Sequence, residues 1–179
     1  MHRGASKGSG REWAEAALER GDRVAATSPS AAAFDDLVDK YGDAVLPLRL
    51  DVADRAASFE AVQTAVERFG GLGVVANNAG YGLFGMTEEV TEQQAREQID
   101  VNPFGALWVT QAVLPHLRAR GSGHIIQVSS IGGVTSLPGL GLCHASKFAL
   151  EGFSASLAAE VKGFGIHVTL IEPAGHDTG

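Results

Sequence analysis

The sequence predicts a doubly wound α/β domain, with a parallel sheet between two layers of helices in a three-layer α/β/α arrangement. Short apolar runs of strand length alternate along the chain with amphipathic segments of helical period. This alternation is typical of βαβ units, in which crossover helices join parallel strands. The 23 glycines among 179 residues lie between these segments, where α/β turns need them.

Each element is expected from a local pattern. The expected strands are the apolar runs at residues 23–27, 45–50, 72–76, 124–128 and 166–171. The expected helices cover residues 10–20, 31–41, 54–69, 88–100, 104–120 and 143–163. The third of these helices carries on one face Phe59, Val62, Val66 and Phe69. A chain of 179 residues has the length of one domain, so residues 1–179 are expected to form a single unit.

Composition argues against several classes of protein. The chain carries 14 Lys and Arg against 21 Asp and Glu, and it has no basic patch that would attract a nucleic acid or an anionic membrane. No apolar run approaches the roughly 18 residues of a membrane span, and no signal peptide opens the chain. Cys143 is the only cysteine, so no internal disulfide can form and a cytoplasmic location is expected. The six histidines show no metal-ligand spacing, so no metal site is expected.

A glycine-rich loop, with glycines at 4, 8 and 10, leads into the first expected helix. Without side chains, the backbone of such a loop can approach a pyrophosphate, and the helix N-terminus supplies unpaired N–H groups and a partial positive charge. A simple turn is the alternative interpretation, because glycine-rich loops are common.

The loop also raises a question about the sheet. A loop of this type should follow a strand, yet only residues 1–3 precede Gly4. In a doubly wound sheet the first strand is central. We therefore expect either that the chain begins late or that the sheet lacks its middle strand.

Two further segments stand at the ends of expected strands. Asp51 follows the strand at 45–50, where its carboxylate is placed to accept a hydrogen bond from an adenine amino group. Capping of the following helix is the alternative role for Asp51. The run Asn77-Asn78-Ala79-Gly80 follows the strand at 72–76, at the sheet edge where ligands bind in open α/β folds. Asparagine and glycine at that point are also consistent with a plain turn.

Ser130, Cys143 and Lys147 are separated by 13 and 4 residues. The serine follows an expected strand, and the lysine lies one helical turn beyond position 143, so the three converge if strand and helix are adjacent. His144 is next to Cys143, but adjacent helical residues point about 100° apart, so the two make a poor nucleophile–base pair and a cysteine hydrolase is disfavoured.

Together these motifs resemble those of the short-chain dehydrogenase/reductase family, over residues 3–178. The glycine loop resembles the family's Thr-Gly-x-x-x-Gly-x-Gly, and the run at 77–80 matches its Asn-Asn-Ala-Gly. Asn102 and Ser130 fall at the positions of a catalytic asparagine and serine. The segment from Cys143 to Lys147 matches Tyr-x-x-x-Lys in all but the tyrosine. Pro173 and Thr178 correspond to residues that contact the cofactor.

The resemblance implies a Rossmann-type fold and transfer of a hydride between a nicotinamide cofactor and a small-molecule carbonyl or alcohol. It implies catalytic roles for Asn102, Ser130, Cys143 and Lys147. It implies cofactor contacts at Gly4, Ser6, Lys7, Gly8, Gly10, Asp51, Asn78, Ala79, Gly80, Lys147, Pro173 and Thr178. In this family the lysine binds the nicotinamide ribose and lowers the pKa of the tyrosine, while the asparagine holds a water linked to the lysine. A homo-oligomer, a dimer or a tetramer, is expected.

Departures from the family pattern cluster at these working positions. Arg3 replaces a threonine, Ser9 replaces a small apolar residue, and Ala174 replaces a glycine. Pro103 removes one N–H and is expected to bias Asn102 away from right-handed helical geometry. The chain also ends before the helices that cover the substrate and the last strand of the family. These changes suggest a fragment or a decayed copy.

Cys143 is the most consequential departure. A lysine one turn away would lower the pKa of a phenol from about 10 toward neutrality, but this chain has no phenol there. A thiol can also donate a proton, although it is shorter than a phenol and acid catalysis needs contact within about 3.2 Å. An inert small residue is the favoured interpretation. We therefore expect an NAD(P)-dependent oxidoreductase with weakened or lost catalysis. A non-catalytic nucleotide-binding or interaction protein on the same scaffold is the alternative.

The expected cofactor is NADP, with NAD as the alternative. An acidic residue at the end of the second strand of such a fold would hold the ribose 2′-OH of NAD. The corresponding segment, residues 27–30, reads Thr-Ser-Pro-Ser and contains no acid. Lys7 lies in the glycine loop, where the family often places a basic residue against the 2′-phosphate of NADP.

Overall fold

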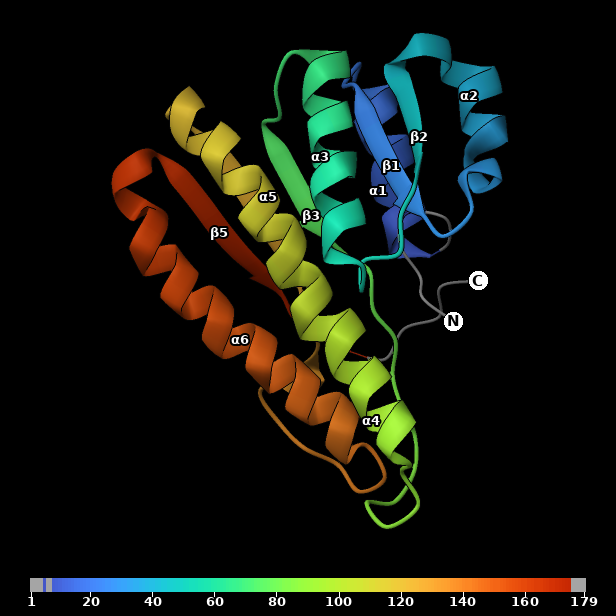
Figure 1. Ribbon diagram of the computed structural model, residues 1–179, viewed down its shortest axis with the longest axis vertical. Helices are drawn as coiled ribbons and strands as arrows, with labels where there is room; N and C mark the ends of the chain where they lie inside the picture. The colour runs from blue at the N-terminus through green and yellow to red at the C-terminus, as the bar shows by residue number, and fades with distance from the viewer. Residues whose placement is uncertain (1–4, 6–7, 175–179) are drawn as a thin grey trace.

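The structure is a computed structural model that describes residue 5 and residues 8–174. Its five strands are β1 Val24–Ser28, β2 Val45–Arg49, β3 Val74–Asn77, β4 Gly123–Val128 and β5 Ile166–Ile171. Every strand pair is parallel. The pairs form two sheets, one of β1 and β2 and the other in the order β3-β4-β5 (Figure 1). The predicted parallel α/β fold is confirmed.

The helices are α1 Ser9–Glu19, α2 Asp35–Tyr41, α3 Arg55–Phe69, α4 Glu92–Ile99, α5 Gly105–Arg120 and α6 Gly141–Val161. In Figure 1, α3, α5 and α6 lie on the viewer's side of the strands, whereas α1 lies behind β1. This arrangement has helices on both sides of the strands, as a doubly wound fold requires. Among the described residues, no helix has both the length and the apolar character needed to cross a membrane.

Two separate hydrophobic clusters correspond to the two sheets. The larger joins α3, α5 and α6 to β4 and β5 through Val62, Ala112, Val113, Leu117, Ile125, Leu157, Val161 and Ile166. The smaller joins α1 and α2 to β1 and β2 through Leu18, Ala26, Phe34, Leu37 and Val45. Among the described residues these clusters share no member, so each sheet has its own group of core side chains.

Among the described residues, no strand pairs with the edges of β1 and β3 that face each other, and we call this place the open strand position. Within the described part of the chain, β1 pairs with a strand only on its β2 side, and β3 pairs only with β4. The backbone N–H of Ala5 donates to the carbonyl oxygen of Thr27 at 3.2 Å, so the chain at residue 5 runs beside the end of β1. Val74, on one face of β3, is 61% exposed.

The region of α4 and the turn that joins it to α5 differs from the prediction in two ways. The first helix begins at Glu92, not near residue 88, because Thr91 and Gln94 form a capping box. The expectation that Pro103 moves Asn102 out of helical geometry is wrong. Residues Asp100–Phe104 form a π-helical turn that continues directly into α5. The wider turn accommodates a residue without an N–H, and such turns often occur at functional sites.

Candidate functional site

Three predicted site residues meet at the loop that follows β3. A Cβ built on Gly80 would lie 3.1 Å from Asn102 Oδ1 and 3.6 Å from Lys147 Nζ. Asn102 comes from the π-helical turn and Lys147 from α6, so one glycine brings together three elements that are far apart in sequence. The absence of a side chain at position 80 lets the other two approach the loop closely.

The side chain of Asn102 is buried and fully engaged. Its Oδ1 accepts a hydrogen bond from Tyr81 N–H at 3.1 Å. Its Nδ2 donates to Tyr81 O at 3.0 Å and to Ser146 Oγ at 2.9 Å. Gln98, which is completely buried, donates to the same Tyr81 carbonyl at 3.0 Å. The amide of Asn102 therefore fixes the loop after β3 against α6.

Lys147 extends from α6 to the end of β4. Its Nζ donates to the carbonyl oxygen of Val128 at 2.8 Å. Burial lowers the pKa of the Lys147 ammonium, while the nearby Cys143 and Glu151 act in the opposite direction and favour its charged form. The amine is thus held in place close to Gly80, in an environment that eases loss of its proton.

The lysine should make the stability of the chain depend on pH. Its pKa is lowered in the folded state from the ordinary 10.5, so the unfolded chain binds more protons in the interval between the two values. Stability therefore increases as the pH rises from the folded-state pKa toward 10.5. Urea midpoints measured from neutral pH upward should show this rise in the wild type and a smaller one in Lys147→Met. Parallel curves for the two proteins would contradict the assignment.

Ser130 lies directly beyond β4, beside Pro173. Its Oγ accepts a hydrogen bond from Gly132 N–H at 3.1 Å and donates to Pro173 O at 3.4 Å. The backbone N–H of Ile131 donates to the same Pro173 carbonyl at 3.0 Å. These bonds extend the β4–β5 pairing beyond the strands and bring two predicted site residues, Ser130 and Pro173, into contact.

Cys143 lies in the first turn of α6 as a free, half-buried thiol. A Cβ built on Gly82 would lie 3.8 Å from its Sγ and 3.4 Å from the ring of Phe84, so the thiol faces the loop after β3. Phe84 is 79% exposed. The first turn of α6 also packs on the turn that carries Ser130, because a Cβ built on Gly132 would lie 2.6 Å from His144 Nδ1. Ser130, Cys143 and Lys147 thus come from two elements that pack on each other, the turn after β4 and α6.

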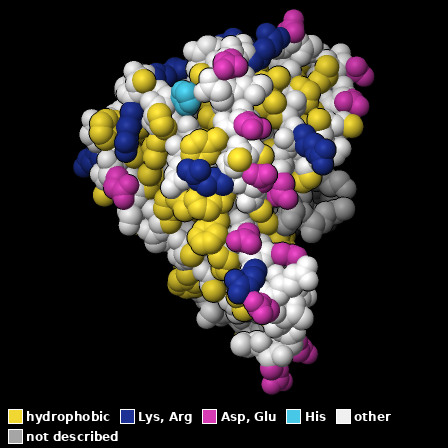
Figure 2. Space-filling view, in the orientation of Figure 1, with side chains coloured by type: hydrophobic (Ala, Val, Ile, Leu, Met, Phe, Trp, Pro, Cys, Tyr) yellow, Lys and Arg dark blue, Asp and Glu magenta, His cyan; other side chains and the backbone are white. Residues whose placement is uncertain are grey.

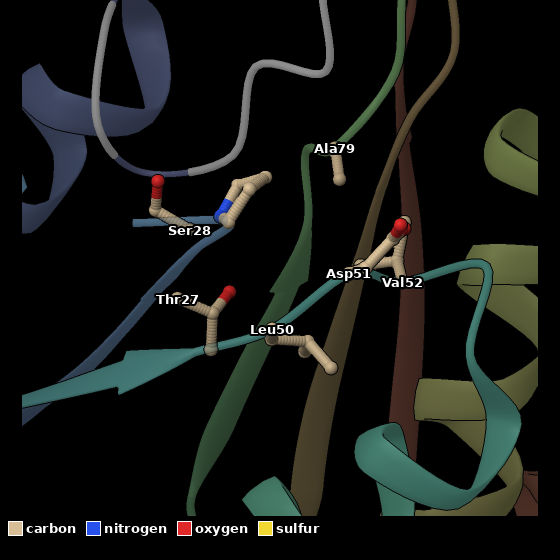
Figure 3. A pocket seen from close by; sticks show the side chains of 7 residues that line it. Thr27, Ser28, Leu50, Asp51, Val52 and Ala79 are labelled. Atoms are coloured by element: carbon tan, nitrogen blue, oxygen red, sulfur yellow. The ribbon is translucent and has the colours of Figure 1, made fainter. Parts of the chain in front are cut away.

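A small pocket lies at the ends of β1, β2 and β3 (Figure 3). It is lined by Thr27, Ser28, Pro29, Leu50, Asp51, Val52 and Ala79. The alternative role of Asp51 as a helix cap is wrong, because Asp54 caps α3 by accepting from Ala57 N–H at 3.0 Å. The Asp51 carboxylate instead accepts from Ala53 N–H at 3.0 Å and lines the pocket.

The glycine loop is only partly described. Gly8 takes a positive φ of 58° immediately before α1, and Gly10 is buried in the first turn of that helix. The predicted residues Gly4, Ser6, Lys7 and Thr178 lie outside the described residues. Asn78 directly follows β3 and precedes Ala79 in the loop. Among the described residues, no group of three or more His, Cys, Asp or Glu side chains could hold a metal ion.

Sequence reasoning missed a buried polar network behind the site. Asn77 Nδ2 donates to Gln127 Oε1 at 2.9 Å and to Thr110 Oγ1 at 3.2 Å. Gln127 Nε2 donates to the same threonine hydroxyl at 3.3 Å. These bonds tie β3 to β4 and α5 directly below the loop that carries Gly80. The available signal was a glutamine within an otherwise apolar strand, since buried polar groups need partners.

Comparison with known proteins places this geometry in a family. The model of the short chain dehydrogenase family matches residues 3–179. The oxidoreductase BOA17 of Botryotinia fuckeliana is 44% identical over 173 residues, which are 96% of this chain and 63% of that protein. The chain therefore belongs to the short-chain dehydrogenase family. It spans less than two thirds of the length of this relative.

Solved structures agree with this assignment. A crystal structure of a short-chain dehydrogenase from Streptomyces avermitilis is 40% identical and superposes with a TM-score of 0.95, covering 98% of this chain and 66% of that one. A 3-ketoacyl-(acyl-carrier-protein) reductase from Brucella melitensis, complexed with NADH, is 26% identical with a TM-score of 0.90 and coverages of 95% and 72%. ElxO with NADP bound is 27% identical with a TM-score of 0.91 and coverages of 96% and 71%.

Proposed function

We propose that the chain is a nicotinamide-dependent oxidoreductase that transfers a hydride between its cofactor and a small-molecule carbonyl or alcohol. The contacts of Gly80 with Asn102 and Lys147, next to Ser130, carry this proposal. They support a site at the ends of β3 and β4, where open α/β sheets bind ligands. Because Cys143 replaces the tyrosine of the family pattern, the activity of this chain is expected to be weak.

The described residues fit a dinucleotide laid across the strand ends. Asp51 and Ala79 line a small pocket beside which an adenine would lie, and Gly8 precedes an α1 N-terminus that suits a pyrophosphate. Lys147 would hold the nicotinamide ribose, and Pro173 would contact the nicotinamide. When bound, the nicotinamide group supplies or accepts the hydride. The relatives solved with NADH and with NADP support a cofactor of this type.

The protein's own residues would manage the substrate oxygen and its proton. Ser130 would orient the oxygen by turning its single hydroxyl hydrogen from the Pro173 carbonyl, 3.4 Å away, toward the substrate. The buried Lys147 ammonium would stabilise the anion that forms when the group at position 143 gives up a proton. The Cys143 thiol is shorter than a phenol, so it would reach the substrate poorly or only through a water.

A pair of measurements tests the proposal. Fluorescence titration with NADPH and NADH measures cofactor binding, and a turnover assay over ketones and secondary alcohols measures hydride transfer. Binding together with turnover is the expected result. Binding without turnover, even after tyrosine is restored at position 143, would favour a non-catalytic nucleotide-binding or interaction protein. Absence of both would overturn the proposal.

The preference for NADP is part of the proposal. Thr27, Ser28 and Pro29 line the pocket at the end of β1 and carry no acid to hold a ribose 2′-OH. NADPH is therefore expected to bind more tightly than NADH. Lys7→Ala should reduce the difference in binding free energy between NADPH and NADH by at most about 1.5–3 kcal/mol, the range for a charged hydrogen bond. Lys162→Ala, an exposed lysine at the far end of α6, is the control. Equal affinity of the unmutated chain for both cofactors would contradict the preference.

We also propose a homo-oligomer and a cytoplasmic location. Figure 2 shows hydrophobic side chains gathered over α5 and α6. Phe148 of α6 and Phe104, directly before α5, are among the exposed large hydrophobic side chains. An exposed apolar patch of this kind marks an interaction surface in a soluble protein. The single free cysteine is consistent with a reducing compartment.

A further inference from the structure

The ring of His144 connects α6 to the loop that carries Ser130. The side chain is buried, with 6% of its surface exposed. Its Nδ1 lies 2.8 Å from the carbonyl oxygen of Gly132, and its Nε2 lies 2.9 Å from the backbone nitrogen of Leu137. Both ring nitrogens are therefore engaged by the backbone of one loop, between β4 and α6.

These contacts define the tautomer of the ring. A backbone N–H can only donate, so Nε2 must accept from Leu137 and carries no hydrogen. A carbonyl can only accept, so Nδ1 must donate its hydrogen to Gly132. The neutral ring with its proton on Nδ1 satisfies both bonds. Neither nitrogen remains free to take a proton from Cys143, which explains in structural terms why the two neighbours do not form a nucleophile–base pair.

Gly132 joins this histidine to the serine of the site. Its carbonyl accepts from His144 Nδ1–H, and its N–H donates to Ser130 Oγ at 3.1 Å. The fit is close, because a Cβ at position 132 would lie 2.6 Å from Nδ1 and 3.5 Å from Ser130 Oγ. The bond from Gly132 occupies one acceptor position of the hydroxyl and so limits the directions in which its hydrogen can point.

We propose that His144 is a positioning residue, which orients the Ser130 hydroxyl through Gly132 and anchors the following loop through Leu137. This inference rests on the proposed function, since it assigns Ser130 the task of orienting a substrate oxygen. The Gly132 carbonyl shares its peptide unit with Gly133 N–H, which donates to Ser130 O at 2.8 Å. A rotation of that unit would open the turn that holds Gly132 N–H 3.1 Å from Ser130 Oγ, and the hydroxyl would lose its fixed orientation. The bond to Leu137 holds the other side of the ring and prevents the turn from opening.

Two substitutions separate the effects of the two hydrogen bonds made by the ring nitrogens. An asparagine amide reaches the position of Nδ1, so His144→Asn keeps a donor for Gly132 and leaves Leu137 without an acceptor. A glutamine oxygen reaches the position of Nε2, so His144→Gln keeps an acceptor for Leu137 and leaves the Gly132 carbonyl unpaired. His144→Phe fills the same space without either bond. His167→Phe, on the exposed side of β5, is the matched control.

Nuclear magnetic resonance of the ¹⁵N-labelled chain detects these two hydrogen bonds and does not require that the protein be active. The expected spectrum has a protonated Nδ1 and an unprotonated Nε2 in His144. Amide exchange of Gly132 should be retained in His144→Asn and rise about tenfold in His144→Gln and His144→Phe, while that of Leu137 should be retained only in His144→Gln. Protonation on Nε2, or equal changes at both amides in the Asn and Gln variants, would overturn the proposal.

Turnover supplies a second readout. It is best measured in proteins that also carry Cys143→Tyr. His144→Phe should lower kcat about tenfold with little change in cofactor affinity, and His144→Asn should restore most of the loss. The control His167→Phe should leave turnover unchanged. Equal kcat losses in the Asn, Gln and Phe variants would also overturn the positioning role. Absence of turnover in every protein, together with the expected amide pattern, would overturn the proposed oxidoreductase function and not the contacts of His144.

Discussion

Cys143→Tyr is expected to raise turnover with ketones or secondary alcohols by about 10²–10⁴-fold, the usual contribution of a positioned general acid. Position 143 lies one helical turn before Lys147, whose amine is held by the Val128 carbonyl at 2.8 Å. A phenol at 143 would therefore gain a neighbouring ammonium that lowers its pKa. The phenol would extend toward the loop after β3. The Phe84 side chain in that loop is 79% exposed, so it can move aside to make room for the ring.

The matched control is Cys143→Phe, which adds the same ring without the hydroxyl. It should bind cofactor as the tyrosine variant does and show no gain in turnover. Cofactor titration of all three proteins separates a change in binding from a change in chemistry. Turnover of Cys143→Tyr that does not exceed the wild-type background, in a protein that binds cofactor, would mean that the proton donor is not what limits this chain.

Sequence patterns located the elements well where one local signal dominated. The segments that became β4 and β5 are short, rich in β-branched residues and bounded by glycine or polar residues, so their predicted ends were close to those observed. The start of α4 was placed too early, although the Thr91-x-x-Gln94 capping box was readable. The π-helical turn around Pro103 was not predictable from propensity, because proline normally ends a helix and packing against neighbouring elements decided the outcome.

For the site, too, some features could be predicted from the sequence and others depended on tertiary packing. Spacing predicted that Ser130, Cys143 and Lys147 converge only if β4 and α6 are adjacent, and α6 does pack on the turn that carries Ser130. The clamp on Tyr81 by Asn102 and Gln98 was not visible, because it depends on how α4 and the π-helical turn pack against the loop after β3. The same limit applies to His144. A histidine in a helix gives no sign of the two backbone groups that the tertiary fold brings to its ring.

The open strand position is expected to limit the stability of the chain. The free edges of β1 and β3 carry backbone groups without strand partners among the described residues, and each such group costs about 1–3 kcal/mol if buried unpaired. A handful of these is comparable with a whole net stability of about 5–15 kcal/mol. The two hydrophobic clusters on either side share no residue, so a strand between them would also join two cores. Exposed edges invite pairing with other chains, so aggregation is expected as well.

Addition of an apolar, Val- and Ile-rich segment of about six residues before Arg3 should therefore raise the melting temperature. Because Ala5 N–H donates to the carbonyl oxygen of Thr27, the chain at residue 5 lies beside the end of β1, next to which such a segment would pair. Recovery of about 5 kcal/mol would correspond to a rise of about 10–20 °C for a protein of this size. A segment of equal length with proline at alternate positions is the control, because it lacks the N–H donors of a central strand. A sharp, reversible transition of the unextended monomer above about 60 °C would show that the open position costs little.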